Sequence, residues 1–201
     1  MMDQNKIAPV IIIDCGSNKT PDIKSILSSL NTPSKIIPLK EANLFPFRSA
    51  SAVIISGGPH LFTDSPAIKN ELMQQFQFLQ QPLPPTLGIC LGHQAIALTY
   101  GGAVYRDQER RDQDSIIILE SHKLFENLPV DPVFKEDHCE GIKAGDNTTV
   151  LARSEFYEVE VIMINDRPML GVQFHPEVSG KNGKILISNF IHWALKHEGA
   201  D

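Results

Sequence analysis

The chain has 201 residues, of which 42% are hydrophobic and 21% charged, so it can bury one sizeable core and is expected to form a single domain over residues 1–201. The formal net charge is −6 and the lysines and arginines are scattered, which argues against nucleic acid or an anionic membrane as a partner, since both need a concentrated basic surface. The longest apolar run, Ala8–Ile13, is much shorter than the ~18 residues that span a bilayer, so no transmembrane helix is expected.

The first half of the sequence alternates short apolar strands with amphipathic helices. Four runs are almost continuously apolar, as strands buried on both faces of a parallel sheet are. They are Val10–Ile13, Lys35–Ile37, Val53–Ile55 and Leu87–Ile89. Thr20 followed by Pro21 predicts a helix that starts after the first strand, with Thr20 as its cap. Ser65-Pro66 predicts a second helix, which continues until Pro82 stops it.

The second half begins after a short helix of about His93 to Tyr100, which Gly101-Gly102 is expected to end. Short strands then follow, joined by polar segments, and some of them are expected to pair antiparallel. They are Ala103–Tyr105, Ile116–Leu119, Val133–Lys135, Val150–Ala152, Val159–Ile164 and Met169–Gln173. A last amphipathic helix, about Gly183 to His197, would cover the sheet. The predicted fold is a three-layer, open, mostly parallel α/β sheet of flavodoxin-like type, which binds ligands beyond the carboxyl ends of its strands.

Cys90 stands where the fourth strand gives way to a helix, with Gly88 and Gly92 on either side. The pattern G-x-nucleophile-x-G predicts a nucleophile elbow, because its strained turn leaves no room for side chains two residues before or after the nucleophile. The turn would direct backbone N–H groups, beginning with that of Leu91, at a tetrahedral oxyanion. The helix N-terminus would favour the thiolate. A buried structural cysteine is the alternative interpretation.

The other two cysteines, Cys15 and Cys139, lie in no comparable turn, so a structural thiol is favoured for both. Three widely spaced cysteines make neither a disulfide framework nor a CxxC metal site, and no metal is expected in this chain. The N-terminal residues Met1 to Lys6 lack a basic flank that leads into a signal-type apolar stretch. These features indicate a cytoplasmic protein.

A cysteine nucleophile needs a base, and His175 is the best candidate among the seven histidines. It follows an apolar strand, and a stiff proline turn places Glu177 two residues away. The Glu177 carboxylate can accept a hydrogen bond from one imidazole nitrogen and leave the other nitrogen facing the thiol. His93, three residues after Cys90, is a competitor because of its proximity. Cys90, His175 and Glu177 therefore form the candidate catalytic triad.

A third segment at the end of a strand, Ser56-Gly57-Gly58-Pro59, has two glycines that let the backbone turn its N–H groups toward a ligand. An oxyanion hole requires such an arrangement. A phosphate-binding nest is the alternative, but no Lys-Ser/Thr pair follows as in a P-loop.

Together these segments resemble the class I (triad-type) glutamine amidotransferases, and the resemblance covers nearly the whole chain. The motifs Ser56–Pro59, Gly88–Gln94 and Gly171–Glu177 occur in the order and spacing of that family. The resemblance implies that a cysteine attacks the side-chain amide of L-glutamine, giving a γ-glutamyl thioester and ammonia, and that water then releases glutamate. It implies Cys90 as the nucleophile, His175 as general base and then acid, and Glu177 as the residue that orients the imidazole.

The same resemblance implies a substrate site without a cofactor in this chain. The backbone N–H groups of Gly58 and Leu91 would form the oxyanion hole, and Gln94 would help to hold the α-amino and α-carboxylate end of glutamine. Within the family, the chain is most similar to the glutaminase part of GMP synthase, especially its separate-subunit form, through segments such as Leu151–Glu155.

Three segments depart from that subfamily. Its Gly-Gln-Tyr after the first strand is replaced by Cys15–Thr20, and its Glu-Tyr-Gly is missing near Tyr105–Gln108. Its Ser-His-x-Asp has become Asp137-His138-Cys139-Glu140. The family couples its two sites through loops that would here be Ser56–Asp64 and Asp137–Ile142, and His138 is the residue expected to sense the partner. The change leaves the identity of the ammonia acceptor open.

The leading hypothesis is a glutaminase that feeds ammonia to a separate ATP-pyrophosphatase-type synthetase, which would bind ATP and Mg²⁺ and make GMP from XMP. One alternative is a free-standing γ-glutamyl amide hydrolase, and another is a subunit for an acceptor of the anthranilate or aminodeoxychorismate type. A third hypothesis, an inactive interaction subunit, is disfavoured by the complete set of Cys90, His175 and Glu177.

Overall fold

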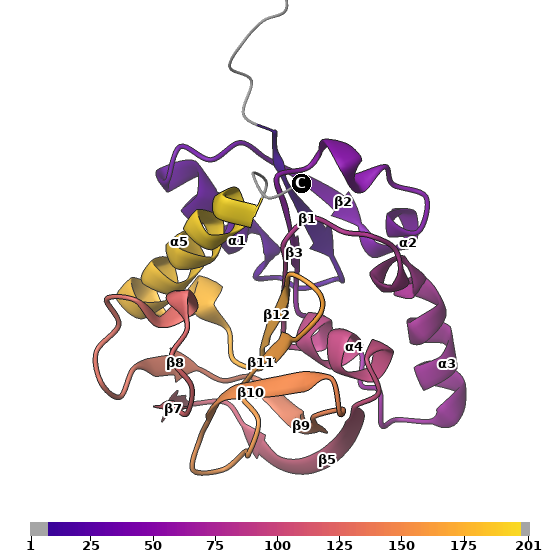
Figure 1. Ribbon diagram of the computed structural model, residues 1–201. Coiled ribbons are helices and arrows are strands. Elements are labelled where there is room, and N and C mark those ends of the chain that lie inside the picture. The colour runs from indigo at the N-terminus through magenta and orange to yellow at the C-terminus, as the bar shows by residue number, and fades with distance from the viewer. Residues whose placement is uncertain (1–7, 198–201) are drawn as a thin grey trace, which may run out of the picture.

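The computed structural model describes residues 8–197, and an eight-stranded sheet runs through its centre (Figure 1). The strand order is β2-β1-β3-β4-β12-β11-β10-β7. The strands are β1 Val10–Asp14, β2 Ser34–Pro38, β3 Ala52–Ile55, β4 Thr86–Ile89, β7 Ile117–Ile118, β10 Thr148–Arg153, β11 Val161–Ile164 and β12 Met169–Val172. The strands from β2 to β12 are parallel, and β11, β10 and β7 continue antiparallel. The predicted fold class is confirmed.

Helices cover both faces of the parallel half, with α1 and α5 on one side and α2, α3 and α4 on the other (Figure 1). The helices are α1 Thr20–Ser29, α2 Leu39–Ala42, α3 Pro66–Gln75, α4 Leu91–Thr99 and α5 Gly180–His197. A hydrophobic core lies on each face of the sheet, and alternate residues of β1 point into one or the other. Val10 and Ile12 pack toward α1 and α5, whereas Ile11 and Ile13 pack toward α4. Strands buried on both faces need apolar side chains at successive positions, which is why the sequence pattern identifies them.

The helix starts show one difference from the prediction. Ser65 caps α3 by accepting a hydrogen bond from the first turn, as expected. Thr20 does not cap α1, because its hydroxyl donates to Oδ1 of Asp14 at 2.9 Å and so ties the helix start to the end of β1. The second helix ends at Gln75, and a 3-10 turn replaces the remainder before Pro82. The short 3-10 turns of the described chain are η1 Phe47–Ser49, η2 Gln77–Gln80, η3 Lys123–Phe125 and η4 Pro176–Val178.

Two antiparallel ribbons lie outside the central sheet. The first pairs β5 (Ala103–Arg110) with β9 (His138–Lys143), and the second pairs β6 (Gln113–Ser115) with β8 (Val133–Lys135). β6 and β9 are not predicted from the sequence, because both are too polar for an apolar-run criterion. The segment expected as a loop over 137–142 is therefore mostly strand. None of the helices in residues 8–197 has both the length and the apolar character needed to cross a bilayer.

Candidate active site

The carboxyl ends of β1, β3, β4 and β12 meet at one edge of the sheet, around a cavity of about 600 Å³. Residues one to three positions after these strands line it, among them Gly16 after β1, Gly58 after β3, Cys90 after β4 and His175 after β12. The β5–β9 side closes the cavity with residues that include His138. This is the edge at which doubly wound sheets bind ligands, since the strand order reverses between β1 and β3.

Cys90 lies on the turn between β4 and α4 with φ +49° and ψ −103°. Residues other than glycine rarely adopt a positive φ, and the surrounding structure must enforce it. The flanking glycines make the turn possible, because a Cβ on Gly88 would lie 2.6 Å from the backbone of Gly92. Since α4 begins at Leu91, the first N–H groups of the helix have no intrahelical acceptor and emerge beside the thiol.

His175 lies next to Cys90 in the cavity wall. Its Nδ1 is 2.8 Å from Oε1 of Glu177, and its ring also forms a hydrogen bond with the Cys90 thiol. Burial by itself would lower the pKa of His175, but the hydrogen bonds with Cys90 and Glu177 outweigh it and raise the pKa to about 10. The structure thus brings the three predicted triad residues together in the order thiol, imidazole, carboxylate.

His93, the competing base, takes a different position. Its ring is fully buried and packs against Gly171 of β12, and it does not line the cavity. Burial lowers the pKa of His93 to about 3, so this ring is neutral at physiological pH. The structure places His175, and not His93, beside the thiol of Cys90.

The glycine turn after β3 lies directly against Cys90. A Cβ on Gly57 would be 3.5 Å from Cβ of Cys90, and a Cβ on Gly58 would be 2.7 Å from the side chain of Leu91. The backbone of Gly58 therefore packs against the side chain of Leu91, the residue that follows Cys90. An oxyanion hole built from the N–H groups of Gly58 and Leu91 stays a prediction from the family resemblance.

Gln94 lies beneath the cavity and does not line it. Its side-chain amide is buried and donates to the backbone oxygen of Glu140 at 3.4 Å and to Oε1 of Gln173 at 3.3 Å. The structure does not bring Gln94 to the surface on which a substrate would lie. Direct contact between Gln94 and glutamine stays a prediction from the family resemblance.

His138 lines the cavity from the β9 side and is buried. Its Nδ1 is 2.9 Å from the backbone oxygen of Glu140, and its Nε2 is 3.0 Å from Oε2 of Glu136. Both ring nitrogens thus face groups of this chain. The Glu140 carboxylate reaches the turn after β3, where it accepts hydrogen bonds from the N–H groups of Phe62 (3.3 Å) and Thr63 (2.7 Å).

The whole chain is similar to known proteins. The model of the family "Glutamine amidotransferase class-I" matches residues 11–193. The chain belongs to the class-I glutamine amidotransferases. Two similar relatives are glutamine-hydrolyzing GMP synthase subunits. The one from Methanococcus aeolicus is 35% identical over 90% of this chain and 95% of the relative, and the one from Pyrococcus abyssi is 34% identical over 90% and 96%.

Solved structures support the fold. A protein from Thermoplasma acidophilum described as a GMP synthase subunit matches with a TM-score of 0.83 at 24% identity, covering 97% of this chain and 98% of that chain. A glutamine amidotransferase from Thermotoga maritima matches with a TM-score of 0.72 at 21% identity, covering 98% and 87%. At these identities the likeness concerns the architecture of the amidotransferase domain.

The mouth of the amidotransferase cavity carries charged residues that the sequence analysis does not identify. Asp137 forms ion pairs with Lys19, from the turn after β1, and with Arg111, which follows β5. Arg111 also pairs with Glu109. These side chains come from distant parts of the sequence, and no motif links them. They place charges of both signs in the lining of the cavity.

The other two cysteines differ from Cys90, although all three are unpaired. Cys15 is buried, and its backbone N–H donates to Oγ of Ser56. Cys139 is half-buried at the cavity wall. Burial raises the pKa of both thiols, so neither is prepared to ionise.

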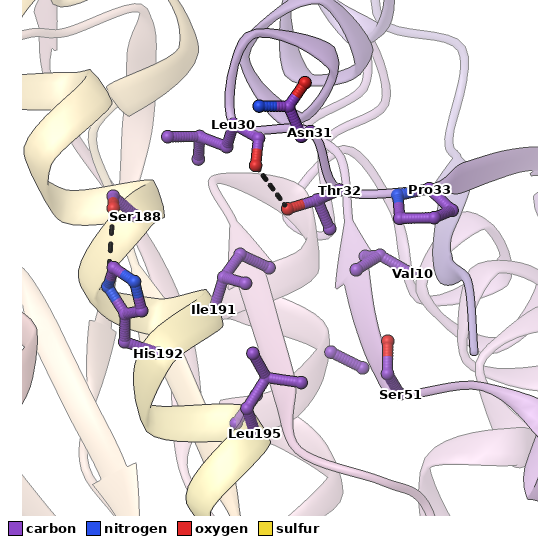
Figure 2. A pocket seen from close by; sticks show the side chains of 12 residues that line it. Val10, Leu30, Asn31, Thr32, Pro33, Ser51, Ser188, Ile191, His192 and Leu195 are labelled. Atoms are coloured by element: carbon purple, nitrogen blue, oxygen red, sulfur yellow. Dashed lines mark hydrogen bonds between the residues drawn. The ribbon is translucent and has the colours of Figure 1, made fainter. Parts of the chain in front are cut away.

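A second cavity of about 200 Å³ lies at the amino-terminal end of the parallel strands, away from the triad (Figure 2). It lies between the end of α1 and the last turns of α5, and Leu30, Ile191 and Leu195 contribute to its mainly apolar lining. Figure 2 shows His192 turned toward Ser188, with Nδ1 at 3.5 Å from Oγ. Its lining holds neither a cysteine nor a carboxylate, so it lacks the groups of an amidotransferase site.

Proposed function

We propose that the chain hydrolyses the side-chain amide of L-glutamine through a thioester on Cys90 and passes the ammonia to a separate synthetase subunit that makes GMP from XMP. The observation that carries the chemistry is the buried contact of Cys90 with His175, and of His175 with Glu177, at the mouth of a cavity. The relatives named as glutamine-hydrolyzing subunits of GMP synthase support the choice of acceptor.

In the first half of the reaction, the Cys90 sulfur attacks the side-chain carbonyl carbon of glutamine. The carbonyl oxygen then carries a negative charge, which the N–H groups of Gly58 and Leu91 stabilise by hydrogen bonding. His175 holds the proton that the leaving nitrogen needs. When the tetrahedral intermediate collapses, the C–N bond breaks, ammonia leaves with this proton, and a γ-glutamyl thioester remains on Cys90.

In the second half, water attacks the thioester and His175, now neutral, accepts its proton. The C–S bond breaks, glutamate leaves, and the thiol of Cys90 recovers its proton from His175. Glu177 holds Nδ1 of the ring throughout and stabilises the imidazolium whenever it forms. The raised pKa of His175 keeps the proton available at neutral pH for the leaving nitrogen.

Coupling to a synthetase would pass through the contact between β9 and the turn after β3. The carboxylate of Glu140 is bonded to the N–H groups of Phe62 and Thr63, so a shift of β9 moves the turn that begins with Gly58. His138 would act through the same strand and not by direct contact with a partner, because both of its ring nitrogens already face this chain.

We place this reaction in the cytoplasm and assign it to one glutaminase domain over residues 1–201. The supporting observation is that Cys15, Cys90 and Cys139 are unpaired, and the catalytic thiol must remain reduced, as thiols do in the cytoplasm. ATP and Mg²⁺ would be bound by the synthetase.

The test compares glutamine turnover of the purified chain alone with turnover after addition of the synthetase, ATP and XMP. We expect a slow enzyme alone and a rise of about 5- to 150-fold, which corresponds to a coupling of ~1–3 kcal/mol. Glu140→Gln and His138→Ala should reduce this rise more than they reduce the basal rate. Glu158→Gln, an exposed change in the same half of the chain, serves as the control.

Unchanged turnover in the presence of the synthetase would contradict the assignment of this chain as a synthetase partner. Fast hydrolysis of γ-glutamyl amines by the chain alone would instead support a free-standing γ-glutamyl amide hydrolase. Stimulation by an anthranilate- or aminodeoxychorismate-type synthase would keep the glutaminase chemistry and change only the acceptor.

A further inference from the structure

Behind His138, two buried carboxylates converge on its ring. Glu136 lies two residues earlier, and Glu160 precedes β11 of the central sheet. Glu136, His138 and Glu160 each present one nitrogen or oxygen atom, and these atoms all lie within 4.8 Å of one another. The exposed fraction is 2% for Glu136, 7% for His138 and 0% for Glu160. The triad chemistry described above uses none of these three side chains.

The hydrogen bonding of His138 leaves a lone pair that faces the carboxylates. Its Nδ1 lies 2.9 Å from the backbone oxygen of Glu140, which can only accept, so Nδ1 carries the ring hydrogen. Nε2 then has no hydrogen, although it lies 3.0 Å from Oε2 of Glu136. Two acceptor atoms at this distance require a positively charged species between them, either a proton or a metal ion.

The surroundings of Glu160 favour a metal ion over a shared proton. Neither of its carboxylate oxygens has a hydrogen-bond partner, and Oε1 of Glu136 also has none. Within residues 8–197, no lysine or arginine forms an ion pair with Glu136 or Glu160, because Arg110, the nearby cation, is held by Asp114. Ser154 favours the charged form of Glu160. Its oxygen accepts two backbone N–H groups, which leaves one hydroxyl hydrogen as the most that Ser154 can offer to the two carboxylates.

Two buried carboxylates without a cation are costly in the charged form. A divalent cation would neutralise both carboxylates at once and would use the oxygens that have no other partner.

We propose that Glu136, His138 and Glu160 form a buried site for one divalent transition-metal ion of the zinc type. One imidazole nitrogen and two carboxylates are a donor set that such ions accept, whereas Ca²⁺ needs six to eight oxygens. The Nδ1–H of a metal-binding histidine is normally held by a carbonyl or carboxylate, and the backbone oxygen of Glu140 supplies that contact here.

The site is separate from the glutaminase triad and does not depend on the proposed reaction. It would join the cavity wall to the central sheet, because Glu136 and His138 flank Asp137 at the cavity, whereas the backbone N–H of Glu160 donates to Ala152 of β10. The sequence analysis expects no metal because the spacing of the cysteines matches no metal site. The set of Glu136, His138 and Glu160 matches no spacing motif either, since Glu160 is far from the other two residues in the sequence. His138 lines the cavity and provides the route by which an ion would enter.

The experiment uses the full chain with Cys90→Ser, so that the catalytic thiol cannot bind the ion. The protein is stripped with a chelator, dialysed against Zn²⁺ or Co²⁺, and assayed for bound metal by elemental analysis. We expect about one ion per chain and a raised unfolding temperature with Zn²⁺. The Co²⁺ form should absorb in the visible region, as Co²⁺ does when a small number of nitrogen and oxygen ligands bind it.

Glu160→Gln in the same background should lose the ion, the Co²⁺ absorption and the zinc-dependent rise in unfolding temperature. It should still fold, because it removes a buried charge without changing the side-chain volume. Circular dichroism checks this, and Glu136→Gln provides an independent second variant. Glu158→Gln, exposed and two residues from Glu160, is the matched control and should bind metal like the parent.

Either of two results would overturn the proposal. The first is the absence of stoichiometric metal in the folded Cys90→Ser chain, which would mean that protons alone neutralise the carboxylates. The second is binding that persists in folded Glu160→Gln and Glu136→Gln variants, which would place the ion elsewhere.

Discussion

Two buried histidine–glutamate pairs within residues 8–197 look alike in sequence but have different surroundings. In each pair the two residues are separated by one position. His175 Nδ1 lies 2.8 Å from Glu177, and His138 Nε2 lies 3.0 Å from Glu136. Both pairs lie at the same cavity, because His175 and His138 contribute to its wall.

The difference lies in what faces the other ring nitrogen. His175 has the Cys90 thiol there, which helps to raise the pKa of the imidazole to about 10. His138 has a backbone carbonyl there, and burial lowers its pKa. A histidine–carboxylate pair is therefore a proton-transfer device only when the second nitrogen meets a group that exchanges a proton. Otherwise the ring is held neutral with its lone pair directed at a carboxylate.

The largest expected effect comes from removing the group that distinguishes the pairs. Cys90→Ala should lower glutamine hydrolysis by at least ~10⁴-fold, because no thioester can form, and Cys90→Ser should be similarly poor because a serine hydroxyl is much less acidic than a thiol. Release of glutamate and ammonia measures the rate. A glutamine-analogue electrophile should label Cys90 alone, as peptide mass spectrometry would show. Labelling of Cys15 or Cys139 in an active Cys90→Ala chain would contradict the assignment.

The second prediction compares the two histidines directly. His175→Ala should reduce turnover by ~10³- to 10⁴-fold, because both thiol activation and protonation of the leaving nitrogen are lost. His138→Ala should reduce the basal rate much less, since His138 does not contact the thiol. Steady-state rates with glutamine test this order. If His93→Ala is the most damaging of the three changes, the wrong base has been chosen.

The third prediction concerns the carboxylate of the catalytic pair. Glu177→Gln should lower turnover by ~10²-fold, less than His175→Ala, because it misorients the imidazole and weakens the imidazolium without removing either. The fall should appear in kcat. Exposed Glu158→Gln is the charge-matched control. An effect as large as that of His175→Ala would mean that Glu177 does more than orient the ring.

The smallest expected effect is on stability. The folded chain holds the His175 proton with a pKa of about 10, compared with an ordinary value of 6.5. The folded state therefore binds this proton more tightly, and the stabilisation is complete below about pH 6.5 and is lost as the pH rises toward about 10. Cys90→Ala should make the free energy of unfolding fall less over this interval. Urea unfolding at several pH values measures the slope, and parallel slopes would show that the thiol does not hold the proton on His175.

The strands of the parallel half of the sheet can be predicted from the sequence, because the pattern that identifies each strand lies within the strand itself. A strand buried on both faces must be apolar at nearly every position, and Val10–Ile13 and Val53–Ile55 show that pattern directly. The strand β9 cannot be predicted in this way, because His138, Glu140 and other polar residues interrupt any apolar run in it. The burial of these side chains depends on partners from distant segments. The sequence also does not show that the Thr20 hydroxyl bonds to Asp14 instead of capping the helix. Both are polar partners for the same hydroxyl, and the sequence pattern does not distinguish between them.

The fold class, the turn at Cys90 and the motif that carries His175 and Glu177 can be predicted from the amino-acid sequence, because each depends on residues within a few positions of one another. The three-dimensional packing is needed to show that His175 and not His93 meets the thiol, that Gln94 lies below the cavity, and which polar groups are buried together. Side chains such as Glu136 and Glu160 come together only when β8, β9 and β11 have packed. Apolar residues that are buried recur at regular spacings in the sequence, so they can be recognised from it. Polar side chains that pair across distant segments follow no regular spacing.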